Sequence, residues 1–497
     1  MDEQLIPFRP SAIVFIGVYL SSLIAIGFVG YKARRDHSLR DFYLAGKGIG
    51  FVALLLTLYS TQYSGNTLFG FTGKTYRIGY AWAMCIHFMT AVIVFYLLLA
   101  PKLHRVARRH GFITPGDFLN HRFDLPALNA LATIIMVVAI SNYLLAQLMA
   151  MGRALEGLTR LDPERAYIYG VVLLALIIVV YETLGGFRAV VWTDVIQGSV
   201  LLVGFGILLV LVFQNFGSLR AATETLLNSP PEGPPKVRAP DANRCREWLS
   251  YVLVVGMGGA LYPQAIQRIY AARSANILRR SLAVMAFLPL TTTLIAVIVG
   301  IIGAAYIPGL TSATTDRSDA LLTIICRQVQ EHSEFGYWLV VVLFSAVLAA
   351  IMSTADSVLL SISSMLTKDL YGRFLRPQAT ERELTRVGKV FSWALIVLLT
   401  GLAIALKGTT LVQLLDQKFD LLVQLAPAFF LGLHWSGLRA RPTLAGLAAG
   451  TVVALSLTAT LNVFDHGKLF GMHSGFYGLI VNVLIAVIGS LRGSGNG

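Results

Sequence analysis

The stretch GYWLVVVLFSAVLAAIMSTADSVLLSISSMLTKDL, residues 336–370, decides the fold of this chain. Between Gly336 and Thr367 it carries one charged residue, Asp356. A helix of this length measures about 48 Å at ~1.5 Å per residue, which exceeds the ~30 Å thickness of a hydrocarbon core. The stretch therefore predicts a long, tilted membrane helix, and the rest of the chain must supply its neighbours.

Small and hydroxyl-bearing side chains follow one face of this predicted helix. At ~100° per residue, the face carries Ala346, Ala350, Ser353, Ser357, Ser361 and Ser364, with Thr354 and Asp356 at its margins. Small residues let another helix approach closely, and this explains Ser361 and Ser364. The four oxygen-bearing side chains within residues 353–357 differ, because a carboxylate at mid-membrane usually marks an ion or substrate path. They predict a site for a hard monovalent cation.

The composition predicts an integral, multi-pass protein of the cytoplasmic membrane. Of 497 residues, 56% are hydrophobic and 13% charged, and a soluble protein of this composition would expose too much apolar surface. The net charge of +14 could suggest nucleic acid, but the basic residues sit in short loops between apolar runs, as the positive-inside rule explains. No cleavable signal peptide is evident. We expect a lipid bilayer and a small-molecule substrate as partners, no nucleic acid, and take a monomer as the working state.

Cysteine and histidine show no spacing typical of a metal, redox or nucleophilic site, so we do not expect an enzyme. The three cysteines are Cys85, Cys245 and Cys326. Because Cys245 and Cys326 fall in stretches predicted outside the membrane, a disulfide between them stays open.

About thirteen apolar runs are candidates for membrane spans, near residues 11–31, 49–72, 80–101, 126–155, 166–184, 189–214, 247–268, 281–306, 336–367, 388–406, 410–434, 443–463 and 474–491. The loops after spans 1, 3, 7 and 9 are strongly basic, and we place Arg268 in the third of them with Arg273, Arg279 and Arg280. Because these loops lie on one side of a thirteen-span arrangement, the positive-inside rule puts the N-terminus outside and the C-terminus inside.

Two of the predicted spans look broken. In the second, TLYSTQYSGNT at residues 57–67 is a polar island, and in the seventh, GMGGALYPQ at residues 256–264 combines three glycines with a proline. Such interruptions at corresponding places in two halves are typical of a transporter binding site, and unwound backbone at that depth is tolerated where it lines a cavity. A helix kink with glycines for close packing is the simpler alternative.

Five motifs carry a family resemblance. They are GGFRAVVWTDVIQ at 185–197, PQAIQR at 263–268, MST at 352–354 with KDLY at 368–371, DFYLAGKG at 41–48, and ITPGDF at 113–118 with RF at 122–123. The pattern resembles the sodium:solute symporter family from about residue 12 to 490, and within it the proline and pantothenate type.

The resemblance implies an all-α, LeuT-type fold with two inverted five-helix repeats. Its organisation would be an extra helix and first cytoplasmic loop (1–48), a first repeat (49–214), an extracellular loop (215–246), a second repeat (247–434), and two C-terminal helices with a short tail (435–497). It also implies a Na⁺ site between spans 2 and 9, held by the backbone carbonyls of Ser60, Tyr63 and Ala350 and the hydroxyls of Ser353 and Thr354.

Two residues depart from the family pattern. Gln62 stands where proline symporters have an aspartate, which puts proline in doubt as the substrate. Asp356 stands where relatives usually have a small residue. In relatives that bind a second sodium ion, the matching ligands would be Asp356, Ser357 and Asp194. Asp194 could instead be structural and pair with Arg188.

The leading function is therefore Na⁺-coupled symport of a small organic solute such as an amino acid, vitamin or carboxylate. A proton-coupled symporter that uses Asp356, and a transporter-like sensor with a separate signalling partner, are the alternatives. We predict no buried Lys or Arg that would commit the substrate to an anion. The predicted substrate-binding residues are Gln62, Ser64, Asn66, Asn142, Gly258, Gly259 and Tyr262.

Overall fold

The computed structural model describes residues 8–33, 38–64, 66–156, 162–231, 233–311, 316–407, 411–464 and 468–492. The helices are α1 (Pro10–Lys32), α2 (Leu39–Leu44), α3 (Phe51–Gln62), α4 (Phe71–Ile78), α5 (Met84–His110), α6 (Pro115–Phe123), α7 (Pro126–Glu156), α8 (Pro163–Phe216), α9 (Leu219–Leu227), α10 (Gly233–Val237), α11 (Ala242–Ala260), α12 (Pro263–Ala271), α13 (Ala275–Met285), α14 (Leu288–Tyr306), α15 (Leu321–His332), α16 (Glu334–Met365), α17 (Glu381–Ala405), α18 (Leu411–Leu422), α19 (Gly432–His434), α20 (Ala440–Phe464) and α21 (Ser474–Arg492). Shorter 3-10 and π turns are η1 (Ala45–Lys47), η2 (Asn66–Gly70), η3 (Gly79–Ala83), η4 (Ser318–Ala320), η5 (Leu366–Leu375), η6 (Val423–Leu425) and η7 (Pro427–Leu431).

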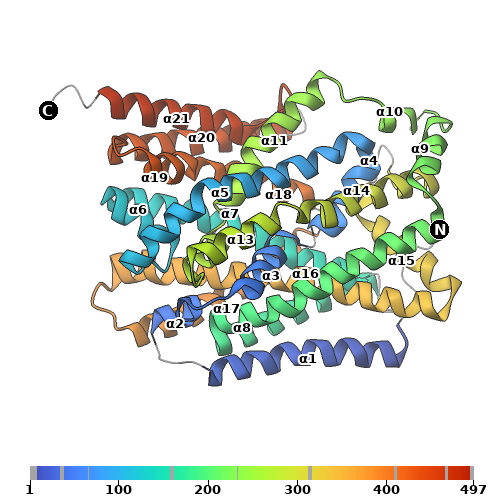
Figure 1. Ribbon diagram of the computed structural model, residues 1–497, viewed down its shortest axis with the longest axis horizontal. Coiled ribbons are helices and arrows are strands. Elements are labelled where there is room, and N and C mark those ends of the chain that lie inside the picture. The colour runs from blue at the N-terminus through green and yellow to red at the C-terminus, as the bar shows by residue number, and fades with distance from the viewer. Residues whose placement is uncertain are drawn as a thin grey trace.

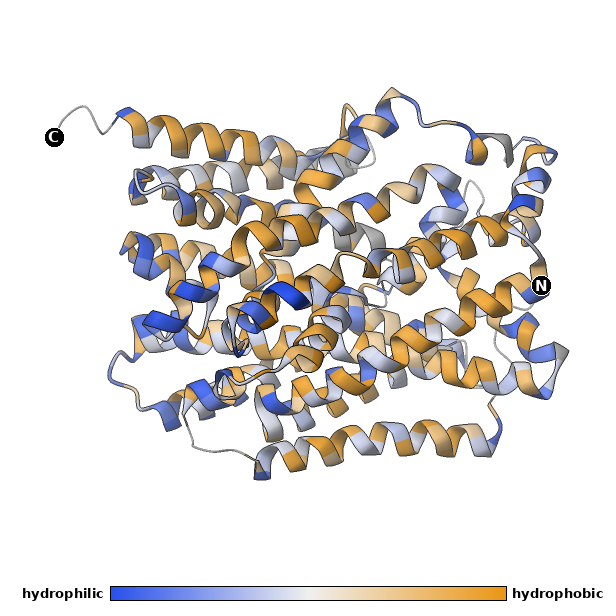
Figure 2. Cartoon of the chain, in the orientation of Figure 1, coloured by the Kyte–Doolittle hydropathy of each residue, from blue (hydrophilic) through white to orange (hydrophobic). Residues whose placement is uncertain are grey.

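The long helices run side by side along one direction (Figure 1). The expected all-helical class is confirmed, because the described residues add only the two-residue strands β1 (Lys468–Leu469) and β2 (Met472–His473), which form an antiparallel hairpin between α20 and α21. Figure 2 shows apolar residues along most of the length of these helices and hydrophilic residues mainly toward their ends. This is the distribution that a bilayer selects.

Within the described ranges, nine helices are long and apolar enough to cross a bilayer, or ten when the bent pair α11 and α12 counts as one span. The number thirteen therefore stays a prediction. Helix α8 explains part of the difference, because its 54 residues would measure about 80 Å, more than twice the ~30 Å hydrocarbon core. Its backbone departs from helical geometry at Gly186, where φ is 60°, and a Cβ there would lie 2.7 Å from Phe42. Only glycine fits this turn, which joins two straight segments.

Helix α16 forms the centre of the bundle. It packs against α7 and α8, and all of residues 343–365 are buried. Helix α1 packs mainly on α8 and exposes most of its apolar side chains, as a lipid-facing helix does. The predicted long helix over 336–367 is thus confirmed, and its polar residues face protein rather than lipid.

Both predicted interruptions are present, although one lies later than expected. Helix α3 ends at Gln62, and the chain resumes as a helix at Asn66. Helices α11 and α12 meet at 49°, with the break at Leu261 and Tyr262. The expectation that Gly258 and Gly259 themselves are unwound was wrong, because both lie inside α11. Their missing side chains serve close packing, and Pro263 begins the next helix.

Three of the basic loops contact one another in the structure. Lys47 Nζ donates to Ala107 O at 3.3 Å, and Arg108 Nη1 donates to Arg273 O at 2.5 Å. Lys368 Nζ pairs with Asp117 Oδ2 at 2.5 Å, so the loop after span 9 contacts the loop after span 3. The four loops therefore lie at one end of the bundle, as the predicted topology requires.

The disulfide that the sequence left open is not formed. All three cysteines are free, with Cys245 exposed in α11 and Cys326 buried in α15. Cys326 is therefore part of the packed interior rather than of an outer loop.

Candidate functional site

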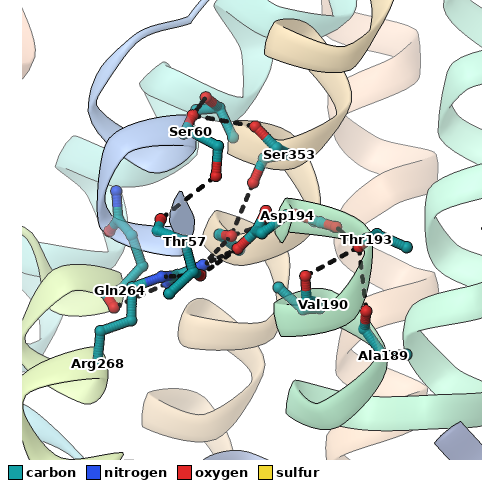
Figure 3. A network of polar contacts seen from close by, with 12 residues as sticks. Thr57, Ser60, Ala189, Val190, Thr193, Asp194, Gln264, Arg268 and Ser353 are labelled. Carbon is teal, nitrogen blue, oxygen red and sulfur yellow. Dashed lines mark hydrogen bonds and ion pairs between the residues drawn. The ribbon is translucent and has the colours of Figure 1, made fainter. Parts of the chain in front are cut away.

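The end of α3 meets the middle of α16 at the predicted cation site. Because the last carbonyls of a helix have no partner within it, Ser60 O is free to accept side-chain hydrogen bonds. It accepts them from Ser353 Oγ at 3.0 Å and Thr354 Oγ1 at 3.4 Å. Ser353 Oγ also lies 3.5 Å from Ala350 O. Figure 3 shows Ser353 pointing toward Ser60. Four of the five predicted ligands thus lie together in one oxygen-only group.

This group fits a sodium ion by its chemistry. It contains two hydroxyls and two carbonyls, all buried, and unwound backbone carbonyls with neighbouring hydroxyls are the ligands that Na⁺ takes in transporters. Tyr63 lies just beyond the end of α3 in extended geometry. The hydrogen bonds of the described residues do not link its carbonyl to the other four.

A second polar group lies beside the first and contains a buried ion pair. Arg268 Nη2 is 2.7 Å from Asp194 Oδ2, and both side chains are fully buried. Thr57 joins them, since Arg268 Nε donates to Thr57 Oγ1 at 2.7 Å and Thr57 donates to Asp194. The suggested pairing of Asp194 with Arg188 was wrong. Arg188 instead pairs with Asp41 at 2.6 Å.

The same arginine reaches the other two residues predicted for a second cation. Arg268 Nη2 donates to Ser357 Oγ at 2.5 Å, and Ser357 Oγ lies 3.2 Å from Asp356 Oδ1. Asp356 Oδ2 accepts from the hydroxyl of Tyr181 at 2.6 Å. Asp194, Asp356 and Ser357 therefore belong to one network, which contains two carboxylates and one guanidinium.

Arg268 was missed by reasoning from the sequence. We placed it in a basic loop, whereas it lies in α12 with none of its surface exposed. The available signal was local, because Ala265, Ile266, Ile269 and Tyr270 surround it with apolar residues and all of them are buried. The prediction of no buried Lys or Arg was wrong here, and Lys418 in α18 contradicts it a second time.

A small, partly open cavity lies next to the break in α3. Three of the predicted substrate-binding residues, Gln62, Ser64 and Tyr262, line it. Its other walls are Thr67, Phe71, Phe88, Met89, Val92, Tyr143, Val255, Lys418 and Phe419. Mostly apolar walls with a few polar groups are typical of a small-molecule site.

Comparison with known proteins identifies the family of the chain that carries these sites. A model of the sodium:solute symporter family matches residues 42–450. This chain belongs to the sodium:solute symporter family. Sodium/proline symporters of Staphylococcus aureus are 27% identical to it, over 96% of this chain and 91% of theirs. The protein is therefore a multi-pass membrane transporter and not an enzyme.

Solved structures support the fold of this sodium:solute symporter. A Na⁺-coupled sialic acid symporter in a substrate-bound outward-open state has a TM-score of 0.79 at 18% identity, with 97% of each chain covered. A nucleobase-cation-symport-1 family transporter has a TM-score of 0.50 at 16% identity, with 91% of this chain and 94% of that chain covered. The neighbours are LeuT-fold transporters, so this likeness supports the expected fold and says nothing of the substrate.

Three further predicted residues of this sodium:solute symporter, Asn142, Gly258 and Gly259, are not among the described residues that line the cavity. Asn142 Nδ2 donates to Leu414 O at 3.1 Å. Cβ atoms on Gly258 and Gly259 would lie 3.1 Å from Phe419 and 2.8 Å from Val92, so both glycines permit close helix packing. The side chain of Asn66 lies outside the described part of the chain.

One hydrogen-bonded chain links the two broken helices of the symporter. Gln62 Nε2 donates to the Tyr96 hydroxyl at 2.5 Å, and this hydroxyl donates to Gly259 O at 3.0 Å. Through Tyr96, the end of α3 is tied to the last turn of α11.

Proposed function

We propose that this protein couples the entry of Na⁺ to the uptake of a small organic solute across the cytoplasmic membrane. The observation that carries the proposal is the contact between the Ser353 hydroxyl and the Ser60 carbonyl, 3.0 Å apart. It joins the end of a broken helix to an unbroken one through oxygen atoms alone. The solute would be of the amino acid, vitamin or carboxylate type.

The cation and substrate sites share one segment of chain, and this supports coupling between them. Ser60 belongs to the cation group, while Gln62 and Ser64 line the cavity just beyond it. A sodium ion would supply positive charge to the carbonyls of Ser60 and Ala350 and the hydroxyls of Ser353 and Thr354. These residues would then hold α3 against α16 and order the cavity wall. By linkage, the solute must raise the affinity for Na⁺ by the same factor.

The proposed topology follows from the basic loops. Because the loops after spans 1, 3, 7 and 9 lie at one end of the bundle, we assign that end to the cytoplasm by the positive-inside rule. The N-terminus is then outside and the C-terminus inside. Residues 49–214 and 247–434 would be the two inverted five-helix repeats, with about thirteen helices in all.

Asp356 is proposed to take a second cation, either Na⁺ or a proton. Its network has two buried carboxylates and one guanidinium, so it carries one negative charge in excess when both acids are ionised. An uncompensated buried charge is unfavourable, and a cation among Asp194, Asp356 and Ser357 removes it. Proton coupling is kept as the second candidate because both oxygens of Asp356 contact hydroxyl groups, which can bond to either form of the acid.

Binding of radioactive ²²Na⁺ to the purified protein tests the first site without knowledge of the solute. Ser353→Ala and Thr354→Ala each remove one ligand oxygen, worth about 1–3 kcal/mol, which corresponds to a ~5- to 150-fold weaker Kd. Ser345→Ala is the matched control, since its hydroxyl bonds within α16 to Val341 O at 3.0 Å.

We expect weaker Na⁺ binding in both site variants, parent-like binding in the control, and no displacement of ²²Na⁺ by K⁺. Parent-like Na⁺ binding in both Ser353→Ala and Thr354→Ala would exclude this site.

A further inference from the structure

Lys418 in α18 is a buried lysine that the symport mechanism has not yet used. Only 1% of its surface is exposed. Its ammonium lies 3.1 Å from the centroid of the Tyr143 ring, 4.8 Å from that of Phe419 and 5.1 Å from that of Tyr262. Tyr143 and Tyr262 are themselves stacked, with centroids 5.5 Å apart. The charge thus sits against aromatic faces, where cation–π attraction holds it.

Among the residues that the structure describes, Lys418 has no ion pair and no hydrogen bond. Neither carboxylate of its own helix forms an ion pair with it, because Asp416 and Asp420 are each two residues away and therefore ~200° around the helix. Both are engaged elsewhere. Asp416 accepts from the Tyr251 hydroxyl at 3.0 Å, and Asp420 accepts from Gly475 N at 2.9 Å. A buried ammonium in this position needs an anion to compensate its desolvation.

The same lysine lines the cavity beside the cation site. Gln62, Ser64 and Thr67 are the other polar residues of its walls, and no carboxylate is among the described lining residues. The remaining walls are aromatic or aliphatic. The cavity thus offers one positive charge, a few neutral hydrogen-bonding groups and a largely apolar surface.

We propose that the solute is a small organic monocarboxylate and that Lys418 binds its carboxylate. The inference rests on the proposed symport function and specifies its substrate class. A zwitterionic amino acid fits less well, because its ammonium group would find no acidic partner in these walls. The aromatic rings of Tyr143 and Tyr262 hold the lysine in place until the anion arrives, and the apolar walls contact the body of the solute.

The test measures thermal stabilisation of the purified protein in NaCl and in KCl by defined probes. Propionate, pyruvate and benzoate are the monocarboxylates, propionamide and benzamide their neutral counterparts, and L-alanine the zwitterion. Lys418→Met removes the charge, and Lys418→Arg keeps it. Lys407→Met is the matched control, because Lys407 also lies over a tyrosine ring, Tyr167 at 4.9 Å, but is not among the cavity residues.

We expect at least one monocarboxylate to raise the Tm of the parent by about 2 °C or more in NaCl and less in KCl. The amides and L-alanine should not do so. Lys407→Met should respond as the parent does, Lys418→Arg should keep part of the response, and Lys418→Met should lose it. Without any probe, Lys418→Met should have a higher Tm than the parent, because no charge is then buried without a partner.

Three results overturn the inference. In the first, no monocarboxylate raises the Tm of the parent. In the second, a carboxylate and its amide raise the Tm equally. In the third, a carboxylate raises the Tm of Lys418→Met as much as that of the parent. The comparison of acid with amide uses the parent alone, so it holds even if Lys418→Met does not fold. Binding of ²²Na⁺ separates this failure from that of the proposed function. If the parent binds Na⁺, the symport proposal stands whatever the probes show.

Discussion

Removal of the buried arginine should destabilise the protein, and removal of its partner as well should restore stability. Arg268→Met leaves Asp194 without its cation in a site where neither side chain is exposed. Breaking such a pair on one side costs about 3–5 kcal/mol, whereas replacing both partners by neutral residues is often nearly free of cost. Asp194→Asn added to Arg268→Met keeps an oxygen that can accept from Thr57.

These energies correspond to a measurable change in Tm. Soluble proteins gain about 2.1 cal/mol/K of entropy per residue on unfolding, so 497 residues give ~1 kcal/mol/K. We therefore expect Arg268→Met to lower Tm by about 3–5 °C and the double variant to regain at least half of that loss.

A thiol-reactive fluorophore can follow the unfolding. Cys85 and Cys326 are buried and become reactive only when the bundle opens, while the exposed Cys245 is removed beforehand by Cys245→Ser. Arg220→Met is the control, because Arg220 pairs with Glu224 at the surface, where such pairs contribute little. The reasoning is refuted if Arg268→Met has the same Tm as the parent, or if the double variant has a Tm no higher than that of Arg268→Met.

Two further predictions concern single charged groups. If Asp356 binds a second sodium ion, Asp356→Asn should lower the Hill coefficient or the apparent affinity for Na⁺. If Asp356 carries a proton, the variant should lose the pH dependence of uptake. A variant that equals the parent in Hill coefficient, Na⁺ affinity and pH dependence contradicts both alternatives. In the loop after α2, burial and the nearby Arg40 lower the pKa of Lys47 from 10.5 to about 8. Since the unfolded chain binds more protons between these values, the stability of the parent rises with pH over this window. Lys47→Met should therefore have the higher Tm below pH 8, an advantage that fades as the pH approaches 10.5, and a constant difference across this range would count against the argument.

Proline is not favoured as the solute despite the proline symporters among the relatives. The family resemblance places an aspartate in proline symporters where this chain has Gln62, and the structure puts Gln62 in the cavity wall. Lys418 lines the same wall, and no carboxylate is among its described residues. A neutral amide in place of an aspartate, beside a lysine, makes the wall a poorer partner for the positively charged group of proline.

The local pattern of apolar and polar residues in the sequence was enough to predict the class of this protein. Apolar runs, basic loops and the long stretch around Ser353 and Thr354 predicted a helical membrane protein with one polar centre, because hydropathy and helical periodicity depend only on neighbours in the chain. The interruption after Gln62 was also visible, since a run of polar residues and glycine weakens a helix wherever it occurs. With the family motifs, these features predicted a cation site, and the structure brings four of its five predicted residues together.

Only the tertiary structure decided the charges inside the bundle. Arg268 looked like a loop residue and Lys418 was not singled out, because the sequence does not show what surrounds a side chain. Asp194 was matched with the nearby Arg188, yet its partner lies 74 residues away on another helix. The pairing of buried charges, and the one lysine left without an anion, depend on which helices meet, and that is set by packing between segments far apart in the chain.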